Sequence, residues 1–468
     1  MDSKHSPGFL SIVDLRAKLA SGAISASQLV DACIEREQAN GPLLNAYQFR
    51  NDEQFRQQAD AADRAWRNGA GQALTGIPVS LKSVFAARGF ECYAGTKFPM
   101  PPKWQREGTL VNRLHQQLSP VSGLTHASEL AFGGLGINQH WGTPRNPWDA
   151  DNHRVPGGSS SGAALSVISG SAAFALGTDT GGSVRVPAAA AGLVGLKPGQ
   201  KRWPTDGLVP LSPKFDSIGV IARRVTDVIE VFLALDGSET KPADFSAAVS
   251  LADFRVRLAD QSAIAGLAPD LLAVYDSAIR ELCKAGATVR DSDNRLFGET
   301  IELLNQGPNT AAIECASFIE LEIPDWRDKL SPRTDRLISE AEKVTASHYL
   351  TRLQRLRDMQ TLAGEWMQGT DIMISPTLSI TTPILDQVDN SEAYSGASAG
   401  MLRNTVVANI CGFCALTLPS GLDAQGMPTG LQLMAKGGDE LKLLQFARLV
   451  ENVLGNSAER LGKAPLLT

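Results

Sequence analysis

The feature that most constrains this fold is a run without any charged residue, Val155–Thr178. Its 24 positions would be long enough for a membrane helix, but they include six serines and five glycines. So many polar and helix-weakening residues argue against a segment that faces lipid. The run is instead expected to be buried and to pack closely against other backbone, because its side chains are small.

The charge balance argues against several classes of partner. The 468 residues carry 44 Lys and Arg against 50 Asp and Glu, a net charge of −6. Such a chain is not expected to bind nucleic acid or an anionic membrane as its main partner. The six cysteines are sparse and irregularly spaced, which argues against a disulfide scaffold, and the first residues, MDSKHSPGF, show no apolar signal segment. We therefore expect a cytoplasmic protein.

Helical and extended patterns of apolar residues alternate along the chain, which predicts an α/β fold. We expect one domain over residues 1–468, with a variable and mainly helical insertion at approximately 240–365. A capping-box pattern begins at Ser25, and Pro78 is expected to mark an edge strand or a strand start. The clearest expected elements are helices at 268–285, 349–367 and 440–454, strands at 76–81 and 371–376, and a strand that turns at 419–421.

Metal and nucleotide motifs have little support. The six histidines include no i,i+4 pair and no H-E-x-x-H. Cys411 and Cys414 form a single CxxC without a second pair of ligands, so both are expected to be buried packing residues. The glycines at 133–136 lack the third glycine of a dinucleotide fingerprint. The sequence therefore predicts neither a metal site nor a cofactor.

One serine lies in a formal nucleophile motif. The segment 158–162 matches G-x-S-x-G, which would make Ser160 the nucleophile of an α/β-hydrolase. That fold also needs a catalytic histidine late in the chain, and the last histidine, His348, lies in a charge-rich helical stretch. The motif is therefore attributed to chance in a run rich in Gly and Ser.

A second serine has better surroundings. Ser183 directly follows Gly181 and Gly182, where backbone N–H groups can approach a ligand without interference from a Cβ atom. Because the sequence offers no well-placed histidine, lysine is the natural candidate for the base, and a buried lysine can be partly neutral. Lys82 lies in the apolar run 79–85 and is the candidate, although a lysine there would on its own more simply be ion-paired.

These residues lie in motifs through which the chain resembles the amidase signature family of serine hydrolases. The block Pro156–Arg185 resembles the signature of that family, and Gly76–Lys82 resembles its lysine strand. The resemblance covers most of the chain and is weakest at about 240–365. It implies a large mixed β-sheet core flanked by helices on both faces. Further matching segments are 142–149, 195–198, 418–419 and 430–432.

The resemblance also implies the roles of individual residues. Ser183 matches the nucleophile, Ser159 the bridging serine and Lys82 the base of a Ser-Ser-Lys triad, with a cis peptide between Gly158 and Ser159. The expected reaction is hydrolysis of a linear carboxamide through an acyl-enzyme on Ser183, without a cofactor. The other implied site residues are the oxyanion-hole positions Thr180, Gly181 and Gly182, the ion pair Asp179 and Arg185, and the supporting residues Ser160 and Thr178.

Two functions remain open within this family. One is a stand-alone amidase acting on a small carboxamide, and the other is the glutaminase (A-type) subunit of a tRNA-dependent amidotransferase. The glutaminase holds glutamine with an Arg and an Asp. Arg357 lies where that Arg could fall, but the segment 397–407 contains no acidic residue. This favours the stand-alone enzyme, whose partner would be a small amide, and leaves a homodimer open.

The sequence departs from the family pattern near the lysine. Ser83 stands where many members carry Asp, and Gly123–His126 replaces a common Gly-Lys-Thr-Asn. Neither change removes the implied triad, so both are expected to affect the surroundings of the triad and the substrate contacts. The walls of the substrate pocket are expected to include Phe132, Ile137, Asn138 and the helices of 310–350.

Overall fold

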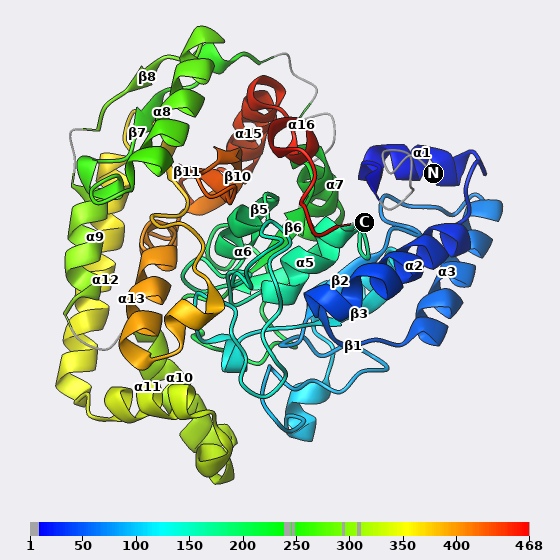
Figure 1. Cartoon of the computed structure of the whole chain (residues 1–468), viewed down its shortest axis with the longest axis horizontal. Coiled ribbons are helices and arrows are strands. Elements are labelled where there is room, and N and C mark those ends of the chain that lie inside the picture. The colour runs from blue at the N-terminus through cyan, green and yellow to red at the C-terminus, as the bar shows by residue number, and fades with distance from the viewer. Residues whose placement is uncertain (1–8, 238–244, 246–248, 293–294, 307–309, 468) are drawn as a thin grey trace.

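The computed structural model describes residues 9–237, 245, 249–292, 295–306 and 310–467. In this part of the chain, eleven strands form one mixed sheet (Figure 1). The pairs β3–β2, β2–β4, β9–β7 and β7–β8 are parallel, and the other neighbours are antiparallel. In spatial order the strands are β1 (Tyr47–Phe49), β3 (Val121–Thr125), β2 (Val79–Lys82), β4 (Phe174–Asp179), β6 (Ser217–Ala222), β5 (Val194–Lys197), β10 (Cys414–Leu422), β11 (Pro428–Ala435), β9 (Ile372–Pro376), β7 (Val256–Leu258) and β8 (Val289–Arg290).

Helices surround this sheet and also form an arm beside it (Figure 1). None of the helices in the described ranges is both long and apolar enough to cross a bilayer. The α-helices are α1 (Ile12–Ala20), α2 (Ala26–Leu44), α3 (Asp52–Arg67), α4 (Thr109–Gln116), α5 (Ser161–Ser169), α6 (Arg185–Ala190), α7 (Val225–Asp236), α8 (Pro269–Lys284), α9 (Leu296–Leu304), α10 (Thr310–Glu322), α11 (Pro332–Glu342), α12 (Ala346–Trp366), α13 (Ser391–Leu402), α14 (Val406–Ile410), α15 (Glu440–Leu454) and α16 (Ser457–Leu461).

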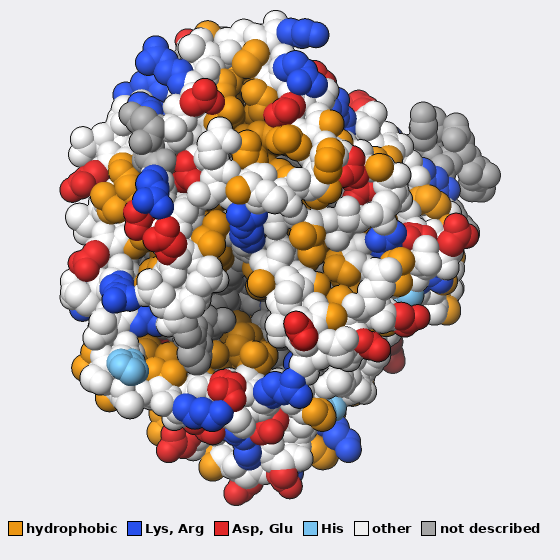
Figure 2. All heavy atoms as spheres, turned by 60° about the vertical axis from the view of Figure 1, so that its left-hand side comes forward, with side chains coloured by type: hydrophobic (Ala, Val, Ile, Leu, Met, Phe, Trp, Pro, Cys, Tyr) orange, Lys and Arg blue, Asp and Glu red, His pale blue; other side chains and the backbone are white. Residues whose placement is uncertain are grey.

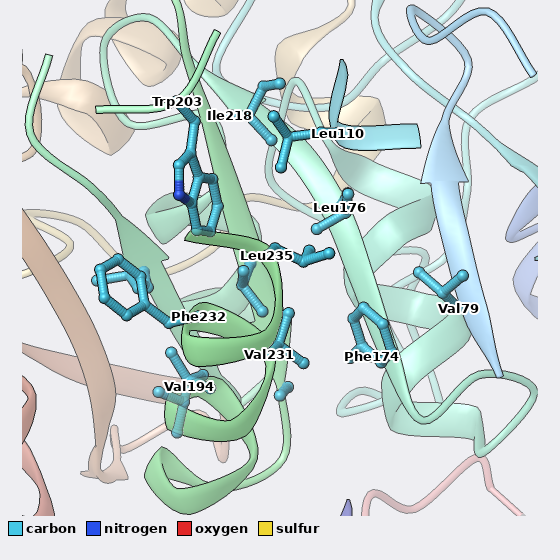
Figure 3. Packing of buried hydrophobic residues seen from close by; sticks show 14 of the residues in the cluster. Val79, Leu110, Phe174, Leu176, Val194, Trp203, Ile218, Val231, Phe232 and Leu235 are labelled. Atoms are coloured by element: carbon cyan, nitrogen blue, oxygen red, sulfur yellow. The ribbon is translucent and has the colours of Figure 1, made fainter. Parts of the chain in front are cut away.

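Strand residues alternate between two apolar cores, one on each face of the sheet. Phe174 and Leu176 of β4 belong to the core that contains α7, as Figure 3 shows. Ala175, between them, belongs to the core that contains α5 and parts of α6. The sheet is therefore covered by helices on both faces, and the expected α/β architecture with a mixed sheet is confirmed.

The uncharged run forms a loop, then α5 and then β4, and every residue in it is buried. A Cβ added to Gly162 would lie 2.0 Å from the carbonyl oxygen of Ala46, so only glycine fits there. The serine hydroxyls find partners inside the protein: Ser166 Oγ lies 2.8 Å from Ser80 Oγ of the neighbouring strand β2. The run is thus a close-packed interior segment, as its small residues predict.

Most of the expected elements are present, and the clearest difference lies at Pro419. The capping box at Ser25 and the helices α8, α12 and α15 follow the predictions closely. Pro78 precedes β2, which lies between two other strands, so it marks a strand start and not an edge. The turn expected at 419–421 was wrong, because β10 continues to Leu422 through a register shift between Pro419 and Gly421.

The stretch between α7 and β9 is mainly helical in the residues that are described, and it holds α8 to α12. It also contributes β7 and β8, which extend the sheet beyond β9. Helices α9 and α12 pack beside α14, and α10 packs against α11. These helices bring several side chains of this stretch to the ends of the central strands.

Candidate active site

Lys82 is the last residue of β2, and its side chain is fully buried. Strands β2 and β4 are parallel, so their carboxyl ends lie at the same edge of the sheet. The Nζ atom of Lys82 lies 2.8 Å from Thr178 Oγ1 on β4 and 2.8 Å from Ser159 Oγ. Two of the residues named from the sequence, one of them the bridging candidate Ser159, are therefore in direct contact with the candidate base.

Ser159 lies in the loop that enters α5, and the peptide bond between Gly158 and Ser159 is cis. The next residue, Ser160, donates its backbone N–H to the carbonyl oxygen of Ser183 at 3.1 Å and its hydroxyl to the carbonyl oxygen of Thr178 at 3.2 Å. Ser160 thus ties the loops of Ser159 and Ser183 together through backbone groups, which is a supporting position.

Ser183 lies between β4 and α6, where the chain leaves the sheet. It is 6% exposed and lines a pocket. In the residues that the structure describes, its hydroxyl makes no hydrogen bond to another protein group, and the N–H groups of Gly181 and Ser183 have no protein acceptor. The Gly182 N–H is already engaged, since it donates to Asp179 Oδ1 at 2.8 Å.

The predicted ion pair between Asp179 and Arg185 is present and has no solvent exposure. Arg185 Nη2 lies 2.9 Å from Asp179 Oδ1 and Arg185 Nε lies 3.0 Å from Oδ2. The guanidinium also donates to Gln432 Oε1 and Asn409 Oδ1, both at 2.6 Å. Because the guanidinium nitrogens all donate to protein groups, Arg185 holds the loop of Ser183 against α14 and β11.

Asp216 is a buried carboxylate that the sequence analysis missed. It lies directly before β6 and accepts a hydrogen bond of 2.5 Å from the Thr180 hydroxyl. Its other oxygen accepts the backbone N–H groups of Leu211 and Ser212, each at 3.0 Å. Asp216 therefore fixes the loop before Ser183 through Thr180. The one signal in the sequence was an acidic residue directly before an apolar strand.

Burial dominates the electrostatics of this cluster. It lowers the pKa of Lys82 to about 7, although the negative charges of Asp216 and Asp179 partly oppose this shift. Burial likewise raises the pKa of Asp216 to about 6, against the effect of its hydrogen bond from Thr180. For Asp179, burial is the largest single effect and raises the pKa, but the charge and hydrogen bonds of Arg185 together with Lys197 and Asn409 lower it to about 2. A lysine that is partly neutral near pH 7 can accept a proton.

A pocket of about 280 Å³ opens beside Ser183, Thr180 and Gly181. The face in Figure 2 is hollowed, and hydrophobic side chains line the hollow. Phe132 lines the pocket as expected, and so do Thr310, Ala311 and Leu337 of the expected 310–350 helices. Ile137 and Asn138 do not line it. Asn138 Nδ2 instead donates to the backbone carbonyls of Gly95 and Ala127. We call this cavity the apolar pocket.

Other candidates named from the sequence lie outside this site. Arg357 is exposed on α12, where it donates to the Gln354 side chain, and it does not line the apolar pocket. Cys411 and Cys414 are buried free thiols, which confirms their expected packing role. Among the described residues, no three His, Cys, Asp or Glu side chains are grouped as metal ligands.

The structure thus combines a mixed sheet covered by helices on both faces with a buried lysine–serine contact and a nearby pocket. The profile of the Amidase family matches residues 28–444, and the chain belongs to this family. It is 38% identical over 458 residues to the 2-amino-5-chloromuconic acid deaminase of Comamonas testosteroni, covering 98% of this chain and 99% of the relative. It is 30% identical to the A-type subunit of the Glutamyl-tRNA(Gln) amidotransferase of Roseiflexus castenholzii, covering 95% and 96%.

Solved structures agree with this assignment. The structure of 6-aminohexanoate cyclic dimer hydrolase complexed with substrate superposes with a TM-score of 0.86 at 25% identity, covering 98% of this chain and 100% of the other. A crystal structure of an amidase superposes with a TM-score of 0.85 at 26% identity, covering 95% and 100%. The fold of the whole described chain is therefore that of amidase signature enzymes.

Proposed function

We propose that the chain is an amidohydrolase that cleaves the C–N bond of a small carboxamide through an acyl-enzyme on Ser183. The observation that carries this proposal is the contact of 2.8 Å between Lys82 Nζ and Ser159 Oγ, next to a serine that lines a pocket. Lys82, Ser159 and Ser183 together form the Ser-Ser-Lys triad of this proposal.

The acylation step follows from this arrangement. Neutral Lys82 accepts the proton of Ser159 while Ser159 accepts the proton of Ser183, and the Ser183 oxygen forms a bond to the carbonyl carbon. The same relay returns one proton to the leaving nitrogen. The C–N bond then breaks, and ammonia or an amine leaves. Water attacks the ester by the reverse relay and releases the carboxylic acid and free Ser183.

The negative oxygen formed during attack needs donors next to Ser183. We assign this role to the backbone N–H groups of Gly181 and Ser183, which have no protein acceptor within the described ranges. Thr180, also predicted as an oxyanion-hole position, is held in the same loop by the hydrogen bond that its hydroxyl donates to Asp216. Gly182 supports the same loop through its bond to Asp179.

A second candidate reaction is deamination of an amino-substituted unsaturated acid, supported by the relative at 38% identity that is named for 2-amino-5-chloromuconic acid. A proton would add to the neighbouring carbon, so that the C=C bond of the enamine becomes the C=N bond of an imine; water then adds to the imine carbon, the C–N bond breaks, a C=O group forms and ammonia leaves. This reaction would use the same apolar pocket and the same proton relay, and it also releases ammonia.

The glutaminase subunit of an amidotransferase has less support. Relatives of that name are 28–30% identical. Glutamine carries an ammonium group that needs an acidic partner, but the described residues lining the apolar pocket include no Asp or Glu. Arg357, the candidate for its carboxylate, faces away from the pocket on an exposed part of α12. These observations favour a stand-alone enzyme.

The test is ammonia release by the purified chain on its own. The panel contains glutamine, aliphatic, aryl and dicarboxylic monoamides, and 2-aminomuconic acid. We expect turnover of at least one amide and no turnover by Ser183→Ala, whose unfolding curve should match the wild type. If 2-aminomuconic acid is the one compound turned over, the deamination replaces amide hydrolysis as the proposed reaction. Equal turnover by Ser183→Ala would refute both.

A further inference from the structure

One charged side chain reaches the apolar pocket. Arg352 of α12 lines it together with Leu303, Leu356 and Tyr394, and among the described lining residues it is the one that carries a charge. Ser183, Thr180 and Gly181 line the same cavity. A molecule that fills the pocket would therefore meet the candidate nucleophile and one guanidinium group.

Arg352 is half-buried and has no carboxylate partner in the part of the chain that is described. Its Nη1 donates to the carbonyl oxygen of Gln306 at 3.0 Å and its Nη2 to that of Leu303 at 3.3 Å. These carbonyls use two of the five N–H donors of the guanidinium. Arg355, one turn further along α12, repels the same charge, and burial together with this repulsion lowers the pKa of Arg352.

A cation that is partly removed from water without a counter-charge is costly to bury, so an anionic partner would stabilise it. The planar guanidinium fork matches a carboxylate in two parallel hydrogen bonds. The rest of the lining is mostly apolar and would hold a short carbon chain. The remaining polar groups of the wall, such as the Ser395 and Ser398 hydroxyls, carry no charge.

We infer that Arg352 binds a carboxylate of the substrate, so that the enzyme selects anionic substrates with the scissile nitrogen at one end and a carboxylate at the other. This inference rests on the proposed function, since it places that substrate between Ser183 and Arg352. It applies to monoamides of dicarboxylic acids and to amino-substituted unsaturated diacids alike.

A purely structural role is the competing explanation. The carbonyls of Leu303 and Gln306 lie at the C-terminal end of α9, where a cation stabilises a helix without any ligand. Arg352→Lys keeps the charge at this end but loses the fork, whereas Arg352→Gln loses both. Arg357→Gln is the matched control, because it removes the same charge from the same helix outside the pocket.

The first test compares amides of equal length with and without the carboxylate: succinamic acid with butanamide, and fumaramic acid with crotonamide. We expect kcat/KM to be higher for the acids. In Arg352→Gln the acid-to-neutral ratio should fall about 10- to 100-fold, mainly through KM, as expected for hydrogen bonds to a charged group. Arg352→Lys should lose less, and Arg357→Gln should keep the ratio. A ratio that Arg352→Gln leaves unchanged would overturn the inference and leave the amidase standing.

The second test measures binding without turnover. Calorimetry measures the Kd of succinate, glutarate and fumarate for the Ser183→Ala variant. In the double variant that also carries Arg352→Gln, the Kd should rise at least about 10-fold. Arg357→Gln in the same background should leave Kd unchanged. If no panel compound is hydrolysed but this pattern holds, the proposed function fails and the carboxylate site stands. If none of the three dicarboxylates binds, or if both variants weaken binding equally, the inference is wrong.

Discussion

Lys82 and Ser159 are in contact at 2.8 Å, and neither side chain is exposed to solvent. They come from positions 77 residues apart, one at the end of an inner strand and one in the loop before α5. A lysine in such a place would normally need a carboxylate partner. Its hydrogen-bond partners here are two hydroxyl groups, which stabilise the neutral amine as well as the charged form.

The pH dependence of activity should follow the titration of Lys82. Burial lowers its pKa to about 7, and the proposed relay needs the neutral amine. The value of kcat/KM should therefore rise with pH through about 7 with the slope of one proton and level off above it. Stopped assays between pH 5 and 9 with the best panel substrate measure this rising part of the pH profile, the acidic limb. A profile that stays flat down to pH 5 would rule out Lys82 as the base.

Asp216→Asn should shift the acidic limb of the kcat/KM profile to lower pH. The negative charge of Asp216 raises the pKa of Lys82, so its removal lowers that pKa further and keeps the amine neutral in more acidic solution. The variant should also lose about 1–3 kcal/mol of stability, because a neutral amide oxygen accepts the N–H groups of Leu211 and Ser212 more weakly than a carboxylate does. Asp358→Asn, at an exposed position of α12, is the control and should leave the limb in place. A shift to higher pH would contradict the electrostatic account.

Gly162→Ala should destabilise the protein by about 1–3 kcal/mol or more, because the added Cβ meets backbone atoms of Ala46 and His126 at 2.0 and 2.5 Å. Gly364→Ala is the matched control. It lies in α12 with nothing within 4 Å of an added Cβ, so it should gain about 0.5–1 kcal/mol from helix propensity. Urea unfolding of both variants checks this. Equal effects would show that the close packing of α5 is not what requires glycine.

Arg185→Met should cost about 3–5 kcal/mol at pH 8, because it leaves the Asp179 charge buried without its partner. Without the guanidinium the pKa of Asp179 rises, so the carboxylate takes up a proton as the pH falls. The difference in stability from the wild type should therefore narrow between pH 8 and pH 5. Arg255→Met breaks a pair with Asp371 in which the arginine is 64% exposed, and it should change the stability far less than Arg185→Met does. A gap that does not narrow would contradict the assigned role of Asp179.

Local signals in the sequence were enough to predict much of the fold. The helix predicted at 440–454 coincides with α15, because a short-range apolar pattern decides its existence. The extension of β10 to Leu422 could not be predicted, because the register shift after Pro419 depends on pairing with β11. Proline at such an irregularity leaves the rest of the ladder intact.

In the candidate site, too, residues that are close in sequence could be predicted together, whereas a residue brought in by tertiary contacts could not. Ser159, Thr178 and Ser183 lie in one continuous motif, so the sequence already grouped them. Asp216 joins them only through the antiparallel pairing of Asp179 with Ser217, which is a tertiary contact.

Arg352, the arginine that lines the apolar pocket, could not be identified from its position in the sequence. Arg352 and Arg357 lie five residues apart, which places them about 140° apart around a helix. Only the packing of α12 decides which of the two reaches the apolar pocket, and it selects Arg352. The order of residues along the sequence therefore does not show which arginine of this helix reaches the pocket.

The most direct test of the account is to locate the reactive serine without choosing a substrate. A fluorophosphonate probe modifies a serine only when its hydroxyl is activated, and peptide mapping by mass spectrometry identifies the modified residue. We predict that Ser183 is labelled, and that Lys82→Met and Ser159→Ala, which break the proposed relay, reduce the labelling rate by at least about 100-fold. Labelling of Ser160 instead of Ser183, or a rate that does not change in Lys82→Met, would contradict the central claim.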